Sequence, residues 1–307
     1  MRIKFLILCL FCLFCSLLNS TTWHIKQDGT GDFTTIQEGI IASVDSDTVL
    51  VYPGTYYENI NYIGKNITVG SLELTTENAA YIDSTIIDGQ CITSCVSLIN
   101  EETDTCLRGL TITNGQGEFD YPKIGGGISI WGDSDLLIQC EIINCVITGN
   151  YGNNSGGMHI KDGIVLLSGT SVRNNYALKT GGGIGISDYT QVTFDPVNRC
   201  SIYNNFAATG IEICTSSSYI EEIEVFVDTF TVAEPNVYFA QMYHYQNINP
   251  YTFDILNYIL EPVNNDLYVS PDGDNSNSGM SLEEPMKTIN LAVRKIASDS
   301  LNPKTIH

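Results

Sequence analysis

The chain has 307 residues, a length that allows about two ordinary domains or one elongated one. Its 14 Lys and Arg oppose 35 Asp and Glu, giving a net charge of −21 at pH 7. This charge argues against a protein that tracks nucleic-acid phosphates or docks on anionic lipid. Hydrophobic residues make up 43% of the chain, which is enough for a packed core and argues against wholesale disorder. Only 16% of residues are charged, while Gly reaches 27 and Tyr 17, a balance that favours extracellular β structure over a cytosolic helical enzyme.

The N-terminus predicts export. Residues 1–4 carry two basic side chains, residues 5–18 are apolar apart from Ser16, and small or polar residues follow at positions 19–21. This order is typical of a secretory signal peptide over residues 1–20, and the apolar run is short for a membrane span. A single N-terminal anchor is the alternative. Since no other stretch is apolar enough to cross a membrane, we expect a secreted or cell-surface protein with no integral membrane segment in its mature part.

Seven cysteines remain once the three within the signal sequence are set aside. They are Cys91, Cys95, Cys106, Cys140, Cys145, Cys200 and Cys214. None of the close pairs is accompanied by a second Cys or His pair at zinc spacing, so no zinc site is predicted. Two alternatives stay open for Cys91 and Cys95: a local disulfide formed in an oxidising compartment, or small apolar side chains that fill a β core.

A repeated unit occupies residues 107–215, and each copy contains an asparagine turn and a glycine followed by alternating apolar residues. The turn asparagines are Asn150, Asn175 and Asn205, and the glycines are Gly127, Gly157, Gly183 and Gly210, spaced 30, 26 and 27 residues apart. A period in this range is typical of a solenoid. Apolar residues at every second position indicate strands, since a helix would place them three and four apart. The sequence therefore predicts an all-β solenoid whose short strands stack in parallel from coil to coil.

Stacked coils place equivalent side chains above one another, so two columns are expected in the core. The first contains Ile128, Met158, Ile184 and Ile211, and the second contains Tyr151, Tyr176 and Phe206. We interpret the asparagines and glycines of the repeat as structural turn residues. Asn tolerates the left-handed conformation and its amide bonds to the neighbouring copies, while Gly fits where a Cβ would clash.

Both ends of the chain carry a related capping unit. Apolar Ile36, Ile40, Ile41 and Val44 fit one face of a short helix before the first coil, and Ile289, Ala292, Val293 and Ile296 repeat that pattern near the C-terminus. Such a helix covers strand edges that would otherwise be exposed. The predicted organisation is a signal peptide over 1–20, a parallel β-helix over 21–218, terminal strands and a linker over 219–262, and the start of a second, truncated β-helix over 263–307.

Two motifs carry a family resemblance. The segments Asp28-Gly-Thr-Gly-Asp-Phe-Thr-Thr-Ile-Gln and Asp47-Thr-Val-Leu-Val-Tyr-Pro-Gly-Thr-Tyr resemble the opening of pectinesterases and of the wider pectin-lyase-like superfamily. The runs Asn174-Asn-Tyr-Ala and Asn204-Asn-Phe-Ala, with their Gly-Gly-x-Ile partners, resemble repeats of polymorphic outer membrane proteins. The resemblance covers roughly residues 22–215 and the restart at 267. It implies a right-handed parallel β-helix with a short N-terminal capping helix, and display at the outer membrane if the source is Gram-negative, but it leaves activity open because many functions share this scaffold.

The expected outward face offers weak catalytic candidates only. The side chains that should alternate with the first core column are Ser129, Trp131, His159, Lys161, Gly185, Ser187, Glu212 and Cys214. Among them, His159 and Lys161 with the adjacent Asp162, and Glu212 two coils away, form the one suggestive cluster. Asp162 and Glu212 would approach the upper limit of the separation, roughly 5–10 Å, that glycosidase carboxylates need. The motifs by which pectinesterases and polygalacturonases are known are missing.

No cofactor is expected, and calcium is the one ion considered. Asp272 and Asp274 lie in a polar run whose composition is similar to a calcium loop, but the run lacks the spacing and distal Glu of an EF-hand. A polar turn cluster is the alternative interpretation.

Two functions remain open. The first is a non-catalytic, secreted or surface-displayed module for adhesion or glycan contact, with a polysaccharide or a host-cell surface ligand as partner and no nucleic acid. The second is a polysaccharide-active enzyme on the same scaffold: a lyase, a hydrolase or an esterase. The net charge of −21 disfavours a polyanionic substrate unless calcium bridges it.

Overall fold

The computed structural model describes residues 20–117, 125–216, 222–232, 242–244, 251–260, 262–297 and 301–307. The predicted signal peptide therefore lies, apart from its last residue, outside the described residues, as do parts of segment 219–262. Within the described part of the chain, no helix is both long and apolar enough to cross a membrane.

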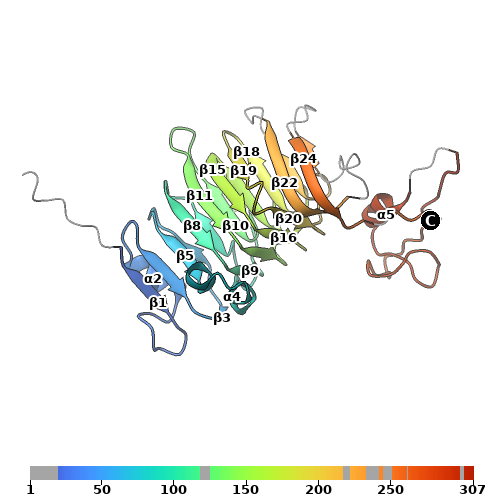
Figure 1. Cartoon of the computed structure of the whole chain (residues 1–307). Helices are drawn as coiled ribbons and strands as arrows, with labels where there is room; N and C mark the ends of the chain where they lie inside the picture. Colours follow the sequence, from blue (N-terminus) through green and yellow to red (C-terminus); the bar gives the residue numbers. More distant parts are fainter. Residues whose placement is uncertain are drawn as a thin grey trace, which may run out of the picture.

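The chain winds into a right-handed parallel β-helix, as expected, and Figure 1 shows its strands stacked coil upon coil. The first sheet is ordered β1 (Thr22–Ile25), β2 (Thr48–Val51), β5 (Thr68–Ser71), β8 (Thr105–Arg108), β11 (Ile138–Ile143), β15 (Gly163–Ser168) and β19 (Gln191–Phe194). The second is ordered β4 (Ile60–Asn61), β7 (Val96–Leu98), β10 (Ile128–Trp131), β14 (Met158–Lys161), β18 (Ile184–Ser187), β21 (Ile213–Thr215) and β23 (Met242–His244). The third is ordered β3 (Gly54–Tyr56), β6 (Thr85–Asp88), β9 (Thr111–Thr113), β12 (Val146–Thr148), β16 (Ser171–Arg173), β20 (Cys200–Tyr203), β22 (Ile223–Phe230) and β24 (Tyr251–Tyr258).

The first core column is confirmed in three of its four members. Ile128 pairs with Met158, and Met158 pairs with Ile184, but the partner of Ile184 is Ile213. The expected member, Ile211, is wrong by two residues. A two-residue shift preserves strand alternation, so the pattern could not reveal it. Glu212 aligns with Gly183, just before β21 begins, and it is fully buried instead of lying on the outward face.

The three turn asparagines form a buried ladder along the solenoid. The side-chain amide of Asn150 donates to the side-chain oxygen of Asn175 at 3.0 Å, and Asn175 donates in the same way to Asn205 at 3.0 Å. The left-handed conformation predicted for these asparagines falls instead one residue earlier, for example at Asn174 and Asn204, both with φ of 55°. The three ladder asparagines are therefore buried residues whose polar groups are satisfied by hydrogen bonds between successive coils.

The aromatic column forms, but outside the core. Tyr151 pairs with Tyr176 between β13 (Tyr151–Gly152) and β17 (Tyr176–Ala177), with ring centroids 5.4 Å apart. Phe206 continues the stack at 4.9 Å from Tyr176. Tyr176 is 39% exposed, whereas Ala177 beside it is fully buried. The expectation that these rings fill the core is wrong, because the small residue of each pair is the one that points inward.

The N-terminal cap is α2 (Ile36–Ala42), with a capping box formed by Thr35 and Glu38. Ile36 and Ile40 are buried as expected, while Ile41 and Val44 are exposed, because the helix ends at Ala42 and packs through Gly39. A Cβ at Gly39 would lie 2.6 Å from a side-chain carbon of Ile25, so glycine permits the close approach. Two further short helices, α3 (Glu73–Thr76) and α4 (Ala80–Ser84), follow β5.

The C-terminal residues form a small unit with its own core of Leu267, Met286 and Ala292. Its helix α5 (Ile289–Lys295) is capped by Thr288. The bridge between Val269 and Met286 is equivalent by sequence to the bridge between Ile25 and Phe33 at the N-terminus. As in α2, half of the expected apolar face is exposed: Ile289 and Val293 lie outward while Ala292 is buried.

None of the seven cysteines in the described part of the chain is bonded to another. Cys91 is exposed and Cys95 is buried, and the Cys95 thiol contacts the carbonyl oxygen of Thr113 at 3.1 Å. The disulfide alternative is therefore not observed. Cys95 behaves as a small core side chain, which was the second alternative.

Candidate functional site

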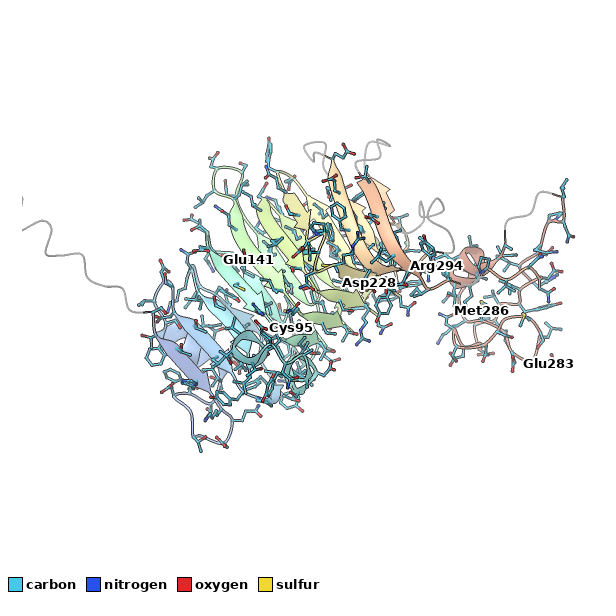
Figure 2. All side chains as sticks on the ribbon, in the orientation of Figure 1. Cys95, Glu141, Asp228, Glu283, Met286 and Arg294 are labelled. Atoms are coloured by element: carbon cyan, nitrogen blue, oxygen red, sulfur yellow. The ribbon has the colours of Figure 1, made fainter. Side chains whose placement is uncertain are left out.

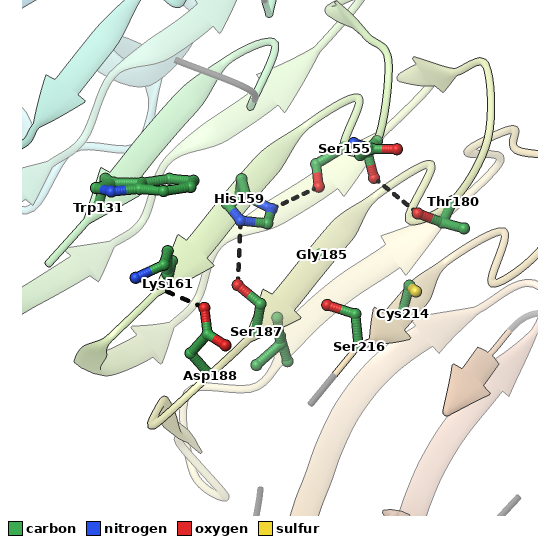
Figure 3. A pocket seen from close by; sticks show the side chains of 12 residues that line it. Trp131, Ser155, His159, Lys161, Thr180, Gly185, Ser187, Asp188, Cys214 and Ser216 are labelled. Atoms are coloured by element: carbon green, nitrogen blue, oxygen red, sulfur yellow. Dashed lines mark hydrogen bonds and ion pairs between the residues drawn. The ribbon is translucent and has the colours of Figure 1, made fainter. Parts of the chain in front are cut away.

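A cleft of about 420 Å³ opens on the outer face of the second sheet. It is lined by Trp131, Asn154, Ser155, His159, Lys161, Thr180, Gly185, Ile186, Ser187, Asp188, Cys214 and Ser216. Figure 3 shows side chains projecting from β10 (Trp131), β14 (His159 and Lys161), β18 (Ser187) and β21 (Cys214), and from the turns beside these strands. Strand pairing explains the arrangement, because residues at equivalent positions of successive coils lie side by side.

Two outward rows build the floor of the cleft. In one row His159 pairs with Gly185, and Gly185 pairs with Cys214. In the other row Lys161 lies between Trp131 and Ser187. The structure therefore brings together most of the side chains expected on this face, the exception being Glu212.

His159 is a buried, neutral imidazole held from both sides. Its Nδ1 lies 3.0 Å from Ser155 Oγ and its Nε2 lies 3.3 Å from Ser187 Oγ. Its ring stacks on Trp131 with centroids 6.0 Å apart. Burial, and then the positive charge of Lys161, lower the pKa of His159 to about 3. Such a weak base does not take a proton efficiently at neutral pH.

Gly185 makes the contact between His159 and Ser155 possible. A Cβ on Gly185 would lie 2.1 Å from Ser155 Oγ and 3.2 Å from His159 Nδ1. The two polar side chains thus occupy the space above a residue that has no side chain of its own. Any larger residue would push Ser155 out of the cleft.

Lys161 is held in a charge network at the rim. Its ammonium group pairs with Asp162, lies 3.6 Å from Asp188, and sits 4.9 Å from the centre of the Trp131 ring. Burial opposes the charge of Lys161, but the hydrogen bond and charge of Asp162 and then the charge of Asp188 raise its pKa. The other oxygen of Asp162 accepts a hydrogen bond from the backbone of Tyr189 at 3.0 Å. Lys161 and Asp162 are therefore both engaged in ion pairs and hydrogen bonds at the rim of the cleft.

Glu212 is buried within the solenoid, at the end of the asparagine ladder. Its carboxylate accepts a hydrogen bond from the Asn205 amide at 2.5 Å. In the preceding coils Gly157 and Gly183 leave room for the next ladder asparagine, whose amide nitrogen would lie 2.9 Å from an added Cβ. Glu212 stands at the equivalent position of the last coil, so its carboxylate takes the place of the missing asparagine. Gly210, the fourth repeat glycine, has a φ of 57° and lies before this position.

The candidate calcium loop shows no metal cluster. Asp274 accepts hydrogen bonds from the backbone and hydroxyl of Ser276 at 2.8 and 2.7 Å. No group of three or more His, Cys, Asp or Glu residues that could hold a metal occurs in the described ranges. Asp274 therefore caps its own turn through Ser276.

The lining of the cleft includes one carboxylate and one thiol. Asp188 is the one carboxylate among its twelve lining residues, so no flanking pair for glycoside hydrolysis is present there. Burial raises the pKa of the Cys214 thiol to about 11, which leaves it protonated and weakly nucleophilic. The remaining groups are hydroxyls, an amide, a neutral imidazole and a tryptophan ring.

Sequence reasoning missed the residues that turns contribute. Asn154, Ser155 and Thr180 line the cleft, and the hydroxyl of Thr180 donates to the carbonyl oxygen of Asn154 at 3.3 Å. The clustering of small polar residues just before each repeat glycine was the available signal. Alternation within strands does not report on turns, so these residues were treated as connections.

No family model matches this chain, and neither does any curated protein. Similar solved structures include a pectin methylesterase in complex with a hexasaccharide, at 13% identity and a TM-score of 0.41, covering 75% of this chain and 67% of that chain. A pectin methylesterase from carrot gives 13% identity and a TM-score of 0.35 over 78% of this chain and 88% of that chain. One from Aspergillus niger gives 12% identity and a TM-score of 0.33 over 78% and 84%. At this identity the likeness assigns no activity, and the β-helix described above rests on the strand pairing of the chain itself.

Proposed function

We propose that this chain is an exported, non-catalytic β-helix module that binds glycan in the cleft of the second sheet. The observation that carries the proposal is the lining: a tryptophan ring beside a row of hydroxyl and amide groups. Sugar rings present both apolar C–H faces and many hydroxyls. A cleft that combines an aromatic surface with paired donors and acceptors matches both features.

The ligand should carry little negative charge. Lys161 is the one cation in the cleft, and Asp162 and Asp188 both compensate it. The chain as a whole carries a charge of −21, which repels polyanions at long range. A neutral glycan is therefore favoured over a polyuronate. Export and surface display, proposed from the N-terminal segment and the repeat resemblance, would bring the cleft to such ligands.

The enzyme alternative requires a proton acceptor, and the described lining offers Asp188 and His159. Asp188 lies 3.6 Å from the Lys161 ammonium, which compensates its charge. His159 touches Ser187, an arrangement in which a base could activate a hydroxyl, but its pKa of about 3 leaves little driving force for proton removal. We therefore favour binding over acyl transfer or hydrolysis.

Tryptophan fluorescence tests the proposal directly. The chain has two tryptophans, so Trp23→Phe leaves Trp131 as the one tryptophan fluorophore. Titration with neutral oligosaccharides should change its emission, and an array of immobilised glycans should identify the preferred ring. Trp131→Ala in the full chain should lose array binding, while Tyr57→Ala, an exposed aromatic on the first coil, serves as the matched control.

Turnover assays decide between binding and catalysis. The purified protein is incubated with pectin, alginate and neutral glycans, with and without calcium, and product release is followed. No release is expected. Release that disappears in His159→Ala, Ser187→Ala or Lys161→Ala would overturn the proposal in favour of the enzyme.

A further inference from the structure

A second cleft, of about 390 Å³, lies where the last coils meet the C-terminal unit. It is lined by Asn204, Asn205, Phe206, Thr231, Ile259, Leu260, Asn275, Leu291, Arg294 and Lys295. Figure 2 shows Arg294 at this junction, beside helix α5 and the end of the stacked strands. Nothing in the proposed glycan-binding function uses this cleft.

Its charge is opposite to that of the rest of the molecule. Arg294 and Lys295 are its two charged lining residues, and no carboxylate is among the ten. In a chain with 35 acidic and 14 basic residues, a concave site of this composition focuses a local positive potential. Such a site favours an anion.

Arg294 also has unused hydrogen-bonding capacity. Its Nε and Nη1 atoms are buried and have no hydrogen-bond partner in the described structure. Burial lowers the pKa of Arg294, and the negative charge of Glu212 partly offsets this effect. Buried donors are nearly always satisfied in native proteins, and a guanidinium pairs best with a planar carboxylate. Because these two atoms are inaccessible, the guanidinium must turn toward the cleft to meet an acceptor there.

An aromatic side chain also lines the cleft. Phe206 belongs to the external stack, in which its ring lies 4.9 Å from that of Tyr176, and it is one of the ten lining residues. An aromatic ring and a guanidinium group in one cleft suit a ligand whose ring carries a carboxylate.

We propose that this junction cleft is a second ligand site, which takes a sugar acid, with the carboxylate on Arg294 and the ring against Phe206. The amides of Asn204 and Asn275, which also line the cleft, provide partners for the sugar hydroxyls. The proposal is independent of the glycan cleft, since the two clefts share no lining residue.

Glu212 makes the site sensitive to pH. The carboxylate lies behind Asn205, to which it is hydrogen-bonded, and burial raises its pKa to about 7. Among the described residues, Arg294 is the charged group that acts on it, and Thr231 and Asn205 hydrogen-bond to it. An anionic ligand favours the neutral form of Glu212, so the affinity should rise as the pH falls through 7. Glu212→Gln should bind more tightly at pH 8 and lose the pH dependence.

Calorimetric titration of the full chain tests the site with three probes. Glucuronate carries both the ring and the carboxylate, glucose carries the ring alone, and acetate carries the carboxylate alone. Glucuronate should bind, and Arg294→Gln should weaken it about tenfold or more, the loss expected for a bidentate charged contact. Arg199→Gln, which removes an arginine paired with Asp254 on the third sheet, is the matched control and should change nothing.

Two further variants keep the result interpretable. Arg294→Lys retains the charge without the fork and should fall between wild type and Arg294→Gln, while a circular dichroism melt confirms that each variant folds. Trp131→Ala should leave glucuronate binding intact, so a failure of the glycan cleft is distinguishable from a failure here. Equal affinity for acetate, equal affinity for glucose, no binding at all, or no effect of Arg294→Gln would each overturn the proposal.

Discussion

The central residue of the asparagine ladder is the most informative single position for stability. In Asn175→Ala, the backbone N–H of Asn150 loses an acceptor at 3.1 Å and the carbonyl of Ile147 loses a donor at 2.9 Å. The ladder contacts to the Asn150 amide and the Asn205 side-chain oxygen are lost as well, but each of these groups keeps another partner. All four lost contacts are buried. Leaving a buried polar group without a partner costs about 2 kcal/mol, so two such groups should lower the free energy of unfolding by about 4 kcal/mol.

Urea unfolding followed by circular dichroism measures this loss. The slope with denaturant should stay unchanged, because the buried surface is nearly the same. Asn257→Ala is the matched control: its amide donates to Asp228 at an exposed site, and it should shift stability by no more than about 0.5 kcal/mol. Asn175→Asp keeps the acceptor and loses the donor, so it should lie between the two. If Asn175→Ala and Asn257→Ala unfold alike, the ladder does not stabilise the wall and the reasoning fails.

Three further predictions concern the cleft, the wall and the external stack. Gly185→Ala should displace Ser155, whose Oγ would lie 2.1 Å from the new Cβ, and should weaken glycan binding in the Trp131 fluorescence titration; unchanged binding would show that Ser155 is not needed. Because burial raises the pKa of Glu212 from 4.5 to about 7, its contribution to stability is complete below pH 4.5 and is lost as the pH rises through 7. The loss should be about 3 kcal/mol in urea unfolding and absent in Glu212→Gln, and an equal pH slope in both proteins would contradict it. Tyr176→Ala removes two ring contacts, each worth about 1 kcal/mol, so its thermal midpoint should fall clearly below that of Tyr57→Ala, an exposed tyrosine of the first coil; equal midpoints would mean that the external stack adds no stability.

The C-terminal unit affects how these measurements are read. It has its own small core and meets the main solenoid at the junction cleft. Unfolding of that unit alone would appear as a separate transition of small amplitude. Fluorescence of Trp131 reports on the main solenoid, so recording it together with circular dichroism separates the two.

The sequence alone was sufficient for the architecture. A repeat of 26 to 30 residues with apolar residues at every second position has one simple solution, in which short strands bury a shared face by stacking. The stacking of Tyr151, Tyr176 and Phe206 also followed from the repeat, because equivalent residues of successive coils must lie above one another. The capping helices followed from their periodicity.

Only the tertiary structure decided whether each column of side chains faces the core or the solvent, and which residue of β21 pairs with Ile184. Alternation divides residues into two faces but does not say which face is inside, so the aromatic stack was assigned to the core although Tyr176 is 39% exposed. A shift of two residues leaves alternation unchanged, so Ile211 was chosen where Ile213 belongs, and the burial of Glu212 was missed. The first cleft combines strands and turns of successive coils, and the second brings helix α5 to coils that are distant from it in sequence. Contacts of that kind are set by the winding of the coils, which no local pattern of residues records.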